Sequence, residues 1–330
     1  MMREPWFWHS HSITAKTIAA ALWPLSALYD FGQRMRWRMT APTTSLAPTI
    51  CIGNATLGGV GKTPFSIALY ELLQEDGVHV QFLTRGYGGV ESGPIKADPA
   101  IHSAAQIGDE PLLLARKGPT WIARDRRVGA NAAAQDGADI IIMDDGYQNP
   151  TLQKTVNILL ISADNPYGNG KVFPAGPLRE PLARAQARAD ITVYVGRNMK
   201  TSQNAADNQG TPFAAWLEPD ETPPPQRVLA FSGIGHPERF FELLRNRDFD
   251  VARTVSFPNH HPFSTQNLSA LKSLARELNA AMITTEKDYV RIPSGQKENI
   301  LTFPVRMKIN QPTLLLDTIR TMIDQSKTPN

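Results

Sequence analysis

A run rich in glycine, closed by a lysine and a threonine, is the clearest chemical signal in this sequence. The run reads Thr56-Leu57-Gly58-Gly59-Val60-Gly61-Lys62-Thr63. It lies between a predicted strand and a predicted helix, as a phosphate-binding loop of the Walker A type requires. In such a loop backbone N–H groups surround phosphate oxygens, the lysine neutralises the β and γ phosphates, and the threonine hydroxyl binds Mg²⁺. We therefore expect the whole run to bind ATP together with Mg²⁺.

One residue of this loop departs from the usual pattern, because Thr56 stands where the pattern has its first glycine. A threonine is tolerated there if its backbone avoids the left-handed region, and the nearby glycines Gly53 and Gly58 supply conformational freedom. The alternative is a glycine-rich turn that binds nothing. That alternative leaves unexplained why Lys62 and Thr63 fall at the start of the predicted helix.

A second motif is an apolar run that ends in two acids. It reads Ile140-Ile141-Ile142-Met143-Asp144-Asp145. The run places carboxylates at the C-terminal edge of a buried strand, where sheets of this type bind ligands. This is a Walker B arrangement, and the predicted Mg²⁺ ligands are Thr63, Asp144, Asp145 and the nearby Gln148. Which aspartate lies nearer the metal stays open, and the competing interpretation is a turn-forming Asp-Asp-Gly sequence.

Further motifs combine turn-forming residues with charge at or near the predicted strand ends. They are Arg85-Gly86-Tyr87-Gly88-Gly89, Gly108-Asp109-Glu110-Pro111, Asp125-Arg126, Asp144-Asp145-Gly146-Tyr147-Gln148 and Pro174-Ala175-Gly176-Pro177-Leu178-Arg179-Glu180-Pro181. Arg85, Arg126 and Arg179 are candidates for holding anionic groups, because a planar guanidinium binds phosphate through two hydrogen bonds. The acceptor of the phosphate has to be inferred from these motifs, since many enzymes share the loop.

Two more runs, Gly53-Asn54-Ala55-Thr56 and Thr284-Thr285-Glu286-Lys287-Asp288, complete a set in a fixed order. With them the chain closely resembles the tetraacyldisaccharide 4'-kinase family, the lipid A 4'-kinases, over essentially its whole length. The resemblance implies that ATP phosphorylates the 4' hydroxyl of a tetraacylated glucosamine disaccharide 1-phosphate. It also implies a place at the cytoplasmic face of the inner membrane of a Gram-negative type of cell, where this lipid substrate is embedded.

The same resemblance implies a catalytic set. Asp109 would accept the proton of the sugar hydroxyl, supported by a histidine near the C-terminal third of the chain, and Lys62 would act on the phosphates. The histidine is His260 or its neighbour His261, and Asn259 stands where the family usually has an aspartate. A carboxylate beside a hydroxyl, with a partner that tunes its pKa, is a sound general base. From the residues alone, a helix N-terminal carboxylate is the competing interpretation of Asp109.

The resemblance also implies a set of contacts to the substrate. The predicted residues are Arg85, Tyr87, Glu110, Arg126, Asn149, Arg179 and Glu180. Asn149 stands where the family usually has a histidine. Because an amide does not titrate, we expect Asn149 to contact substrate or nucleotide without transferring a proton.

Short apolar runs alternate with helical patterns after residue 41, which predicts an α/β fold of doubly wound type with a mostly parallel sheet. The expected organisation is a helical segment over 1–40, a nucleotide-binding and catalytic domain over 41–217, a proline-rich linker over 218–227 and a smaller α/β domain over 228–330. The expected strands of the larger domain are Thr49 to Gly53, Val78 to Thr84, Asp139 to Met143, Val156 to Ser162 and Ile191 to Val195.

The N-terminal segment has apolar residues at helical spacing from about Ile13 to Arg38, with Pro24 bending the run. Its uncharged stretch, Thr17 to Tyr29, is shorter than the roughly 20 residues that a spanning helix needs. We expect residues 1–38 to lie in the membrane surface, with tryptophans at the interface and arginines near anionic headgroups. The alternative is an amphipathic helix packed on the core.

Composition limits the remaining choices. The 330 residues include 34 Lys and Arg against 31 Asp and Glu, a net charge of +3 that does not favour nucleic acid as a partner. No obligate protein partner is evident. Two rival functions remain, a membrane-docked partition ATPase and a soluble kinase of a small metabolite. The first is disfavoured because Leu57 stands where the loop of those ATPases has a signature lysine.

Overall fold

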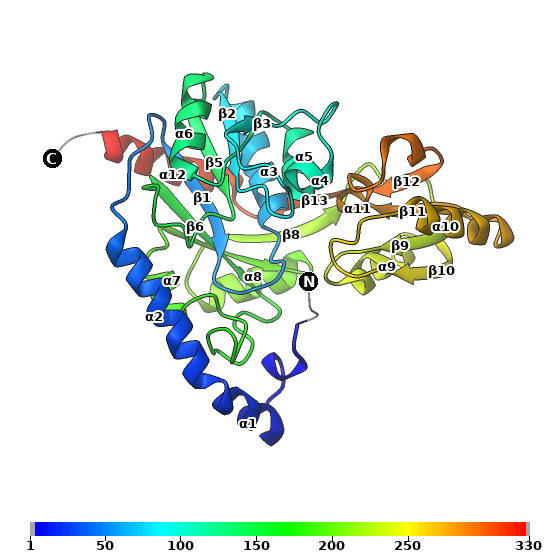
Figure 1. Ribbon diagram of the computed structural model, residues 1–330, viewed down its shortest axis with the longest axis horizontal. Helices are drawn as coiled ribbons and strands as arrows, with labels where there is room; N and C mark the ends of the chain where they lie inside the picture. The colour runs from blue at the N-terminus through cyan, green and yellow to red at the C-terminus, as the bar shows by residue number, and fades with distance from the viewer. Residues whose placement is uncertain (1–3, 328–330) are drawn as a thin grey trace.

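The computed structural model describes residues 4–327 and contains two β-sheets (Figure 1). The larger sheet has nine strands in the order β13-β8-β7-β6-β1-β5-β2-β4-β3, and the smaller has four in the order β10-β9-β11-β12. Neighbouring strands of the larger sheet run parallel except for the pairs β13 with β8 and β3 with β4. The chain is therefore an α/β protein with a large, mixed but mostly parallel sheet and a second, parallel sheet.

The centre of the larger sheet is apolar on both faces, because helices cover both. Its strands are β1 (Thr49–Asn54), β2 (Val80–Thr84), β3 (Ile95–Lys96), β4 (Thr120–Ile122), β5 (Ile140–Asp144), β6 (Val156–Ser162), β7 (Ile191–Gly196), β8 (Ala214–Pro219) and β13 (Val305–Ile309). Every residue of β1, β2 and β5 is buried. Continuous apolar runs of this kind are typical of strands buried on both sides.

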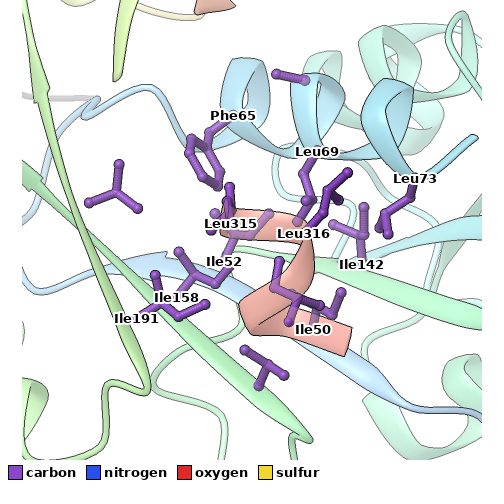
Figure 2. Close-up of a cluster of buried hydrophobic side chains, with 14 of the residues drawn as sticks. Ile50, Ile52, Phe65, Leu69, Leu73, Ile142, Ile158, Ile191, Leu315 and Leu316 are labelled. Carbon is purple, nitrogen blue, oxygen red and sulfur yellow. The ribbon is translucent and has the colours of Figure 1, made fainter. Parts of the chain in front are cut away.

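One face of this sheet is covered by α3 (Lys62–Glu75) and α12 (Pro312–Lys327). The aromatic ring of Phe65 and the side chains of Leu69 and Leu73 point from α3 toward the strands (Figure 2). Leu315 and Leu316 of α12 join the same cluster. Burying a side chain of this size contributes about 1.5 to 3 kcal/mol, so this cluster fixes the orientation of the loop that precedes α3.

The opposite face is covered by helices with small side chains, α6 (Arg126–Gln135), α7 (Leu182–Gln186) and α8 (Met199–Asn208). Their buried residues include Ala130, Ala133, Ala185 and Ala206. Alanine lets helices approach the sheet closely. The remaining short helices beside the larger sheet are α4 (Ala104–Ile107) and α5 (Asp109–Ala115).

The smaller sheet consists of β9 (Arg227–Ser232), β10 (Asp250–Ser256), β11 (Ala281–Thr285) and β12 (Ile300–Phe303). Helix α9 (Pro237–Arg245) packs Phe240, Phe241 and Leu244 on one side of it. Helix α10 (Thr265–Glu277) packs on the other side. The short helices α11 (Glu286–Tyr289) and η2 (Ser294–Gln296) follow β11.

The chain returns to the larger sheet after β12, which differs from the expected continuous unit over 228–330. β13 pairs with β8 in antiparallel register, Val305 opposite Pro219, and α12 packs with the cluster on α3. The apolar face of α12 is readable in the sequence, but which sheet it covers depends on contacts with segments far along the chain. β13 and α12 therefore belong to the larger sheet, although Val305 also packs against the core of the smaller one.

The N-terminal segment forms η1 (Trp6–Trp8), α1 (Ile13–Ala21) and α2 (Trp23–Met39), which extend along one side of the molecule (Figure 1). The predicted bend lies at Leu22 and Pro24, where α1 ends and α2 begins. Few residues of these two helices are buried, namely Ala15, Ala19, Ser26 and Asp30. Among residues 4–327, no helix has the length and apolar character needed to cross a membrane.

Candidate active site

The predicted phosphate-binding loop lies at the C-terminal edge of three adjacent strands, β1, β5 and β2. The loop follows β1, Asp144 ends β5 with Asp145 directly after it, and Arg85 follows β2. In parallel sheets this edge is where ligands bind. Sheet order therefore brings together motifs that lie far apart in the sequence.

Glycine is required at two positions of the loop, since φ is 105° at Gly58 and 90° at Gly61. Thr56 is not among the residues with positive φ, and it forms an isolated antiparallel bridge with Leu178. The threonine at the first position of the pattern is thus accommodated without left-handed backbone. The loop leads directly into α3, whose first residues are Lys62 and Thr63.

Thr63 and Asp144, two of the predicted Mg²⁺ ligands, contact each other directly. The Thr63 hydroxyl donates to Asp144 Oδ2 at 2.9 Å, and the Ser66 hydroxyl donates to Asp144 Oδ1 at 3.1 Å. Burial raises the pKa of Asp144 to about 7, and the carboxylates of Glu110 and Asp145 add to the shift while Lys62 opposes it. The positive charge of Lys62 is too weak to offset the effect of burial on the pKa of Asp144.

Asp145 has the opposite surroundings. Arg179 Nη1 donates to Asp145 Oδ1 at 2.9 Å, and Lys62 Nζ lies 3.7 Å from the same oxygen. Burial alone raises the pKa of Asp145, but Lys62 and Arg179 outweigh it and hold the pKa below its usual range. Arg179 also donates from Nε to the carbonyl of Thr56 at 3.0 Å. Asp145 and Arg179 thereby fix the start of the loop.

Gln148 and Glu180 lie beside the loop but face each other. Gln148 Nε2 donates to the carbonyl of Asn54 at 2.9 Å and to Glu180 Oε1 at 3.2 Å. The carboxylate of Glu180, 4% exposed, also receives two hydrogen bonds from Arg188 at 2.7 and 2.8 Å. Glu180 is thus held within the protein, where it connects Gln148 beside the loop to Arg188, which contacts α2.

That link reaches the N-terminal helices. The Arg188 guanidinium lies between two rings, 4.7 Å from the centre of Trp37 in α2 and 5.1 Å from that of Tyr147. Arg184 pairs with Asp30 of α2, whose carboxylate also accepts from Arg34 at 2.8 Å. A planar guanidinium suits both the stacking and the paired hydrogen bonds. Polar and stacking contacts, not a wide apolar interface, therefore hold α2 in place.

Asp109 begins α5 and faces the smaller sheet. Its position depends on Gly108, where φ is 95° and a Cβ would lie 2.4 Å from the carbonyl oxygen of Tyr87. Asp109 is 5% exposed, and its Oδ2 lies 2.8 Å from His260 Nδ1. Burial raises the pKa of Asp109, but the His260 hydrogen bond and the charges of Lys287 and Arg291 lower it to about 2.

Of the two candidate histidines, the structure brings His260 to Asp109. His261 turns the other way, where its Nε2 lies 3.0 Å from Asn267 Oδ1 and its ring stacks on Phe257 at 4.7 Å. His260 has a positive φ of 59°, which is uncommon for a residue with a side chain. This backbone conformation sends two adjacent side chains in different directions.

The predicted phosphate-binding arginines differ in exposure. Arg85 and Tyr87 are exposed, whereas Arg126 is 3% exposed. Burial, with Arg85 nearby, lowers the pKa of Arg126 to about 10. Arg126 donates from Nη1 to the carbonyl of Ala123, and its Nε is buried without a hydrogen-bond partner in the described part of the chain. A buried guanidinium with an unused donor is suited to an anionic ligand.

Asn149 is engaged locally. Its side-chain oxygen accepts from the backbone N–H of Thr151 at 2.9 Å and from the Thr151 hydroxyl at 2.8 Å. The Asn149 side chain therefore stabilises the turn after the Asp-Asp-Gly motif.

Sequence reasoning missed three groups that the structure places in the site. Asn54 Oδ1 accepts from Lys62 Nζ at 3.2 Å, and Ser66 binds Asp144. Lys287 Nζ of α11 donates to Glu110 Oε1 of α5 at 2.8 Å. A signal existed for Ser66, which lies one helical turn after Lys62 and Thr63. None existed for the pairing of Lys287 with Glu110.

The chain is similar to known proteins over nearly its whole length. The family model described as LpxK, tetraacyldisaccharide-1-P 4'-kinase, matches residues 18–324. The tetraacyldisaccharide 4'-kinase of Parvibaculum lavamentivorans is 44% identical, with 95% of this chain and 96% of that protein covered. That of Hyphomonas neptunium is 40% identical, with coverages of 96% and 97%.

A solved structure agrees in fold. The crystal structure of "apo" form LpxK from Aquifex aeolicus in complex with ATP superposes with a TM-score of 0.73 at 27% identity. It covers 92% of this chain and 99% of the other. The similarity therefore extends over both sheets, not over the nucleotide-binding loop alone.

Proposed function

This chain belongs to the tetraacyldisaccharide 4'-kinase family, and from that premise we propose how its residues bind ATP, activate the sugar hydroxyl and reach the lipid. The protein is an ATP-dependent kinase of lipid A biosynthesis that phosphorylates the tetraacyldisaccharide at its 4' position. The family assignment selects this activity over a partition ATPase or a kinase of a small metabolite.

In our proposal the loop Thr56–Thr63 holds the phosphates of ATP and Lys62 is the cation on the β and γ phosphates. Support comes from the position of Lys62 Nζ, which is held 3.2 Å from Asn54 Oδ1 and 3.7 Å from Asp145 at the end of β1 and β5. These oxygens keep the ammonium group extended over the loop. A pre-positioned charge lowers the energy of phosphoryl transfer because it needs no reorganisation during the reaction.

The residues near Thr63 suit a Mg²⁺ ion. Thr63 and Asp144 offer a hydroxyl and a carboxylate, the hard oxygen ligands that Mg²⁺ prefers alongside phosphate and water. The raised pKa of Asp144 fits this role, since a nearby cation would favour its charged form. When bound, the ion would neutralise charge on the transferred phosphate. Asp145 and Gln148 are already occupied by Arg179, Lys62 and Glu180, so Asp144 is the stronger candidate of the two aspartates.

The single observation that carries the proposed chemistry is the hydrogen bond between Asp109 Oδ2 and His260 Nδ1, 2.8 Å long and beside the nucleotide edge of the sheet. In our proposal the 4' hydroxyl binds to Asp109. Its oxygen forms a bond to the γ phosphorus while the bond from that phosphorus to the β-phosphate oxygen breaks, and ADP leaves. The hydroxyl proton passes to Asp109, while the hydrogen bond with His260 Nδ1 holds that carboxyl group in place.

The low pKa of Asp109 implies that the proton moves only after the hydroxyl oxygen has begun to bond to phosphorus. A carboxyl group with a pKa of about 2 is a weak base, so it first orients the hydroxyl by accepting its hydrogen bond. The hydroxyl becomes acidic only as its oxygen bonds to phosphorus. Proton transfer then follows late, as suits the loose transition state of phosphoryl transfer.

Arg126 and Arg85 are the proposed contacts to anionic groups of substrate or nucleotide, with Tyr87 nearby. Arg126 is buried and retains a free Nε donor among the described residues, which supports a ligand at this position. The ring of Tyr87 lies 6.3 Å from that of His260, edge to face. The exposed Tyr87 ring therefore borders the Asp109–His260 pair.

The N-terminal helices are the proposed contact with the membrane. Their large exposed apolar residues are Ile13, Trp23, Leu25, Leu28, Phe31, Met35 and Met39. A groove of about 570 Å³ between α2 and Phe173–Pro174 continues this surface. Since the substrate carries four acyl chains, a helix pair lying in the bilayer surface would bring the site to its headgroup.

The test of the catalytic proposal is phosphate transfer from labelled ATP to detergent-solubilised disaccharide. We expect Lys62→Ala and Asp109→Ala to reduce transfer by at least about 10²-fold. ATP binding, measured by equilibrium titration, should weaken in Lys62→Ala and persist in Asp109→Ala. Transfer at the unmodified rate in Asp109→Ala would eliminate it as the base.

A further inference from the structure

The motif Thr284-Thr285-Glu286-Lys287-Asp288 lies at the end of β11 and the start of α11. Its Lys287 pairs with Glu110 beside the site, whereas its Asp288 has had no role so far. Asp288 is 0% exposed. Its carboxylate accepts four hydrogen bonds, from the Ser232 and Thr285 hydroxyls at 2.7 Å, the Gly233 N–H at 2.9 Å and Arg291 Nη2 at 2.6 Å. So many donors make Asp288 a fixed anchor for Arg291.

The side chain of Arg291 is also buried, 4% exposed, and it donates to three backbone carbonyls besides Asp288. It donates to the carbonyl of Gly233 at 3.1 Å, to that of His261 at 3.2 Å and to that of Lys287 at 3.2 Å. Its Nε lies 3.6 Å from Asp109 Oδ2. One guanidinium thus touches both the turn that carries His260 and the carboxylate that His260 contacts.

The turn itself depends on the same groups. The backbone N–H of His260 donates to the Gly233 carbonyl at 3.0 Å, the oxygen that also accepts from Arg291. A Cβ on Gly233 would lie 3.0 Å from the carbonyl oxygen of Pro258. The left-handed backbone of His260 costs on the order of 1–3 kcal/mol, and it persists only where surrounding contacts determine it. Arg291 supplies two of those contacts.

We propose that Arg291, anchored by Asp288, is a positioning residue that holds the His260 turn against Asp109 and presents a fixed positive charge to that carboxylate. This inference rests on the proposed role of Asp109 and His260. Lysine would not replace Arg291, because a single ammonium cannot bind Asp288 and two backbone carbonyls in this planar arrangement. The buried Asp288, at the start of α11, thereby gains a function in the reaction.

The charges around Asp109 agree with this assignment. His260 faces it from the turn, Lys287 from α11 and Arg291 from the residues after α11, while Glu110 is the neighbouring acid on its own helix. Lys287 is paired with Glu110 at 2.8 Å. Arg291 and Lys287 both lower the pKa of Asp109 against the effect of burial. Removing the charge of Arg291 therefore raises the pKa of Asp109.

The test compares Arg291→Lys, which keeps the charge and loses the planar contacts, with Arg291→Gln, which loses both. We expect kcat to fall roughly 10- to 100-fold in each, with KM for ATP changed less than about threefold. In Arg291→Gln the acid limb of the pH profile of kcat should also move to higher pH. In Arg291→Lys it should stay in place.

A double variant separates positioning from general damage. If Arg291 acts through His260, Arg291→Lys combined with His260→Ala should be no slower than His260→Ala alone. Arg227→Lys is the matched control, because Arg227 pairs with the exposed Asp250 at the far end of β9. It should keep the unmodified kcat. Circular dichroism gives the folded fraction, to which every rate is normalised.

The inference is overturned if Arg291→Lys retains the unmodified kcat, or if its effect multiplies with that of His260→Ala. A rate that falls only with the folded fraction would likewise reject it. Should Arg291→Gln not fold, the Lys variant and its double with His260→Ala decide the question. If Asp109→Ala remains active the proposed base is wrong, whereas inactive Asp109→Ala with active Arg291→Lys rejects the present inference only.

Discussion

Asp144, the proposed Mg²⁺ ligand, is a buried carboxyl group whose ionisation costs stability. It is 2% exposed, and burial raises the pKa of its carboxyl to about 7. The folded state therefore favours the protonated acid, whereas the unfolded chain releases its proton near pH 4. As pH rises from about 4 through 7, the folded protein loses stability relative to the unfolded chain. A bound cation would oppose that loss.

We expect Asp144→Asn to stabilise the Mg²⁺-free protein at pH 8 by roughly 1–3 kcal/mol, because the amide cannot ionise. The gain should vanish near pH 4, where Asp144 is protonated. Urea unfolding at both pH values measures it. Phosphate transfer should meanwhile be lost with Mg²⁺ present.

Asp248→Asn is the control for this comparison, since Asp248 is exposed and both residue types accept its positive φ. It should leave stability and transfer unchanged. Equal stability of Asp144→Asn and the unmodified protein at pH 8 would contradict the electrostatic account of this site.

Among the elements, α2 is unusual because it buries polar side chains and exposes large apolar ones. Its buried residues are polar, Ser26 and Asp30, while Leu28 and Phe31 are 67% and 58% exposed. The Ser26 hydroxyl donates to the carbonyl of Val172 at 2.8 Å and accepts from the N–H of Ala175 at 3.0 Å. Polar anchors on one face and apolar side chains on the other fit a helix placed between protein and lipid.

Leu28→Asp together with Phe31→Asp should move the protein from membrane vesicles to the soluble fraction and slow turnover of substrate presented in vesicles. Folding should be retained, because both side chains are exposed. Vesicle co-sedimentation and a thermal melt measure the two quantities. Turnover of detergent-solubilised substrate should change much less than turnover in vesicles.

Val90→Asp together with Ile101→Asp provides the matched control, with side chains 71% and 72% exposed on the loops before and after β3. This pair should leave vesicle binding unchanged. Equal loss of binding in both double variants would show general charge repulsion, and no loss in the α2 variant would contradict a membrane role for its exposed face.

At the scale of the molecule, the smaller sheet is attached through two adjacent strands of the larger one. The chain leaves at β8 and returns at β13, where Asp220 N–H donates to the Pro304 carbonyl at 3.1 Å. His260, Lys287 and Arg291 all belong to the part between these strands. In the proposed mechanism the reaction therefore needs both sheets, although the phosphate-binding loop belongs entirely to one.

Replacing residues 222–302 by a short glycine-containing turn should leave a folded protein that binds ATP but does not transfer phosphate. The strand ends to be joined already pair with each other, and α12 remains on its own sheet. Equilibrium titration with ATP and the labelled transfer assay measure the outcome. Removing Val290 would expose Ile107 and Leu112, which should lower the free energy of unfolding by about 1–2 kcal/mol.

Full-length Asp109→Ala is the reference for this excision, because it should show the same combination of ATP binding without transfer. Loss of ATP binding in the folded excision variant would mean that the smaller sheet also contributes to the nucleotide site. Retained transfer would contradict the proposed roles of His260 and Arg291 together.

Local patterns in the sequence determined the elements. The run Val156–Ser162 forms the predicted strand with the predicted bounds, and the strands expected to end at Gly53 and Val195 each continue for one more residue. The loop before Lys62 and the acids after Ile142 were readable for the same reason, since each motif needs only neighbouring residues to define it. The short edge strands β3 and β4 lack such a signal and depend on pairing with partners distant in sequence.

Only the tertiary structure determined the features that depend on contacts between segments far apart in the sequence. The turn at His260 selected one of two adjacent histidines for Asp109, and the return of β13 and α12 assigned the C-terminal residues to the first sheet. Arg291 gained its place beside Asp109 only through the packing of α11 against α5. A sequence defines which residues are able to do chemistry, but distances between segments far apart in the chain arise only when their burial and hydrogen bonds are satisfied together.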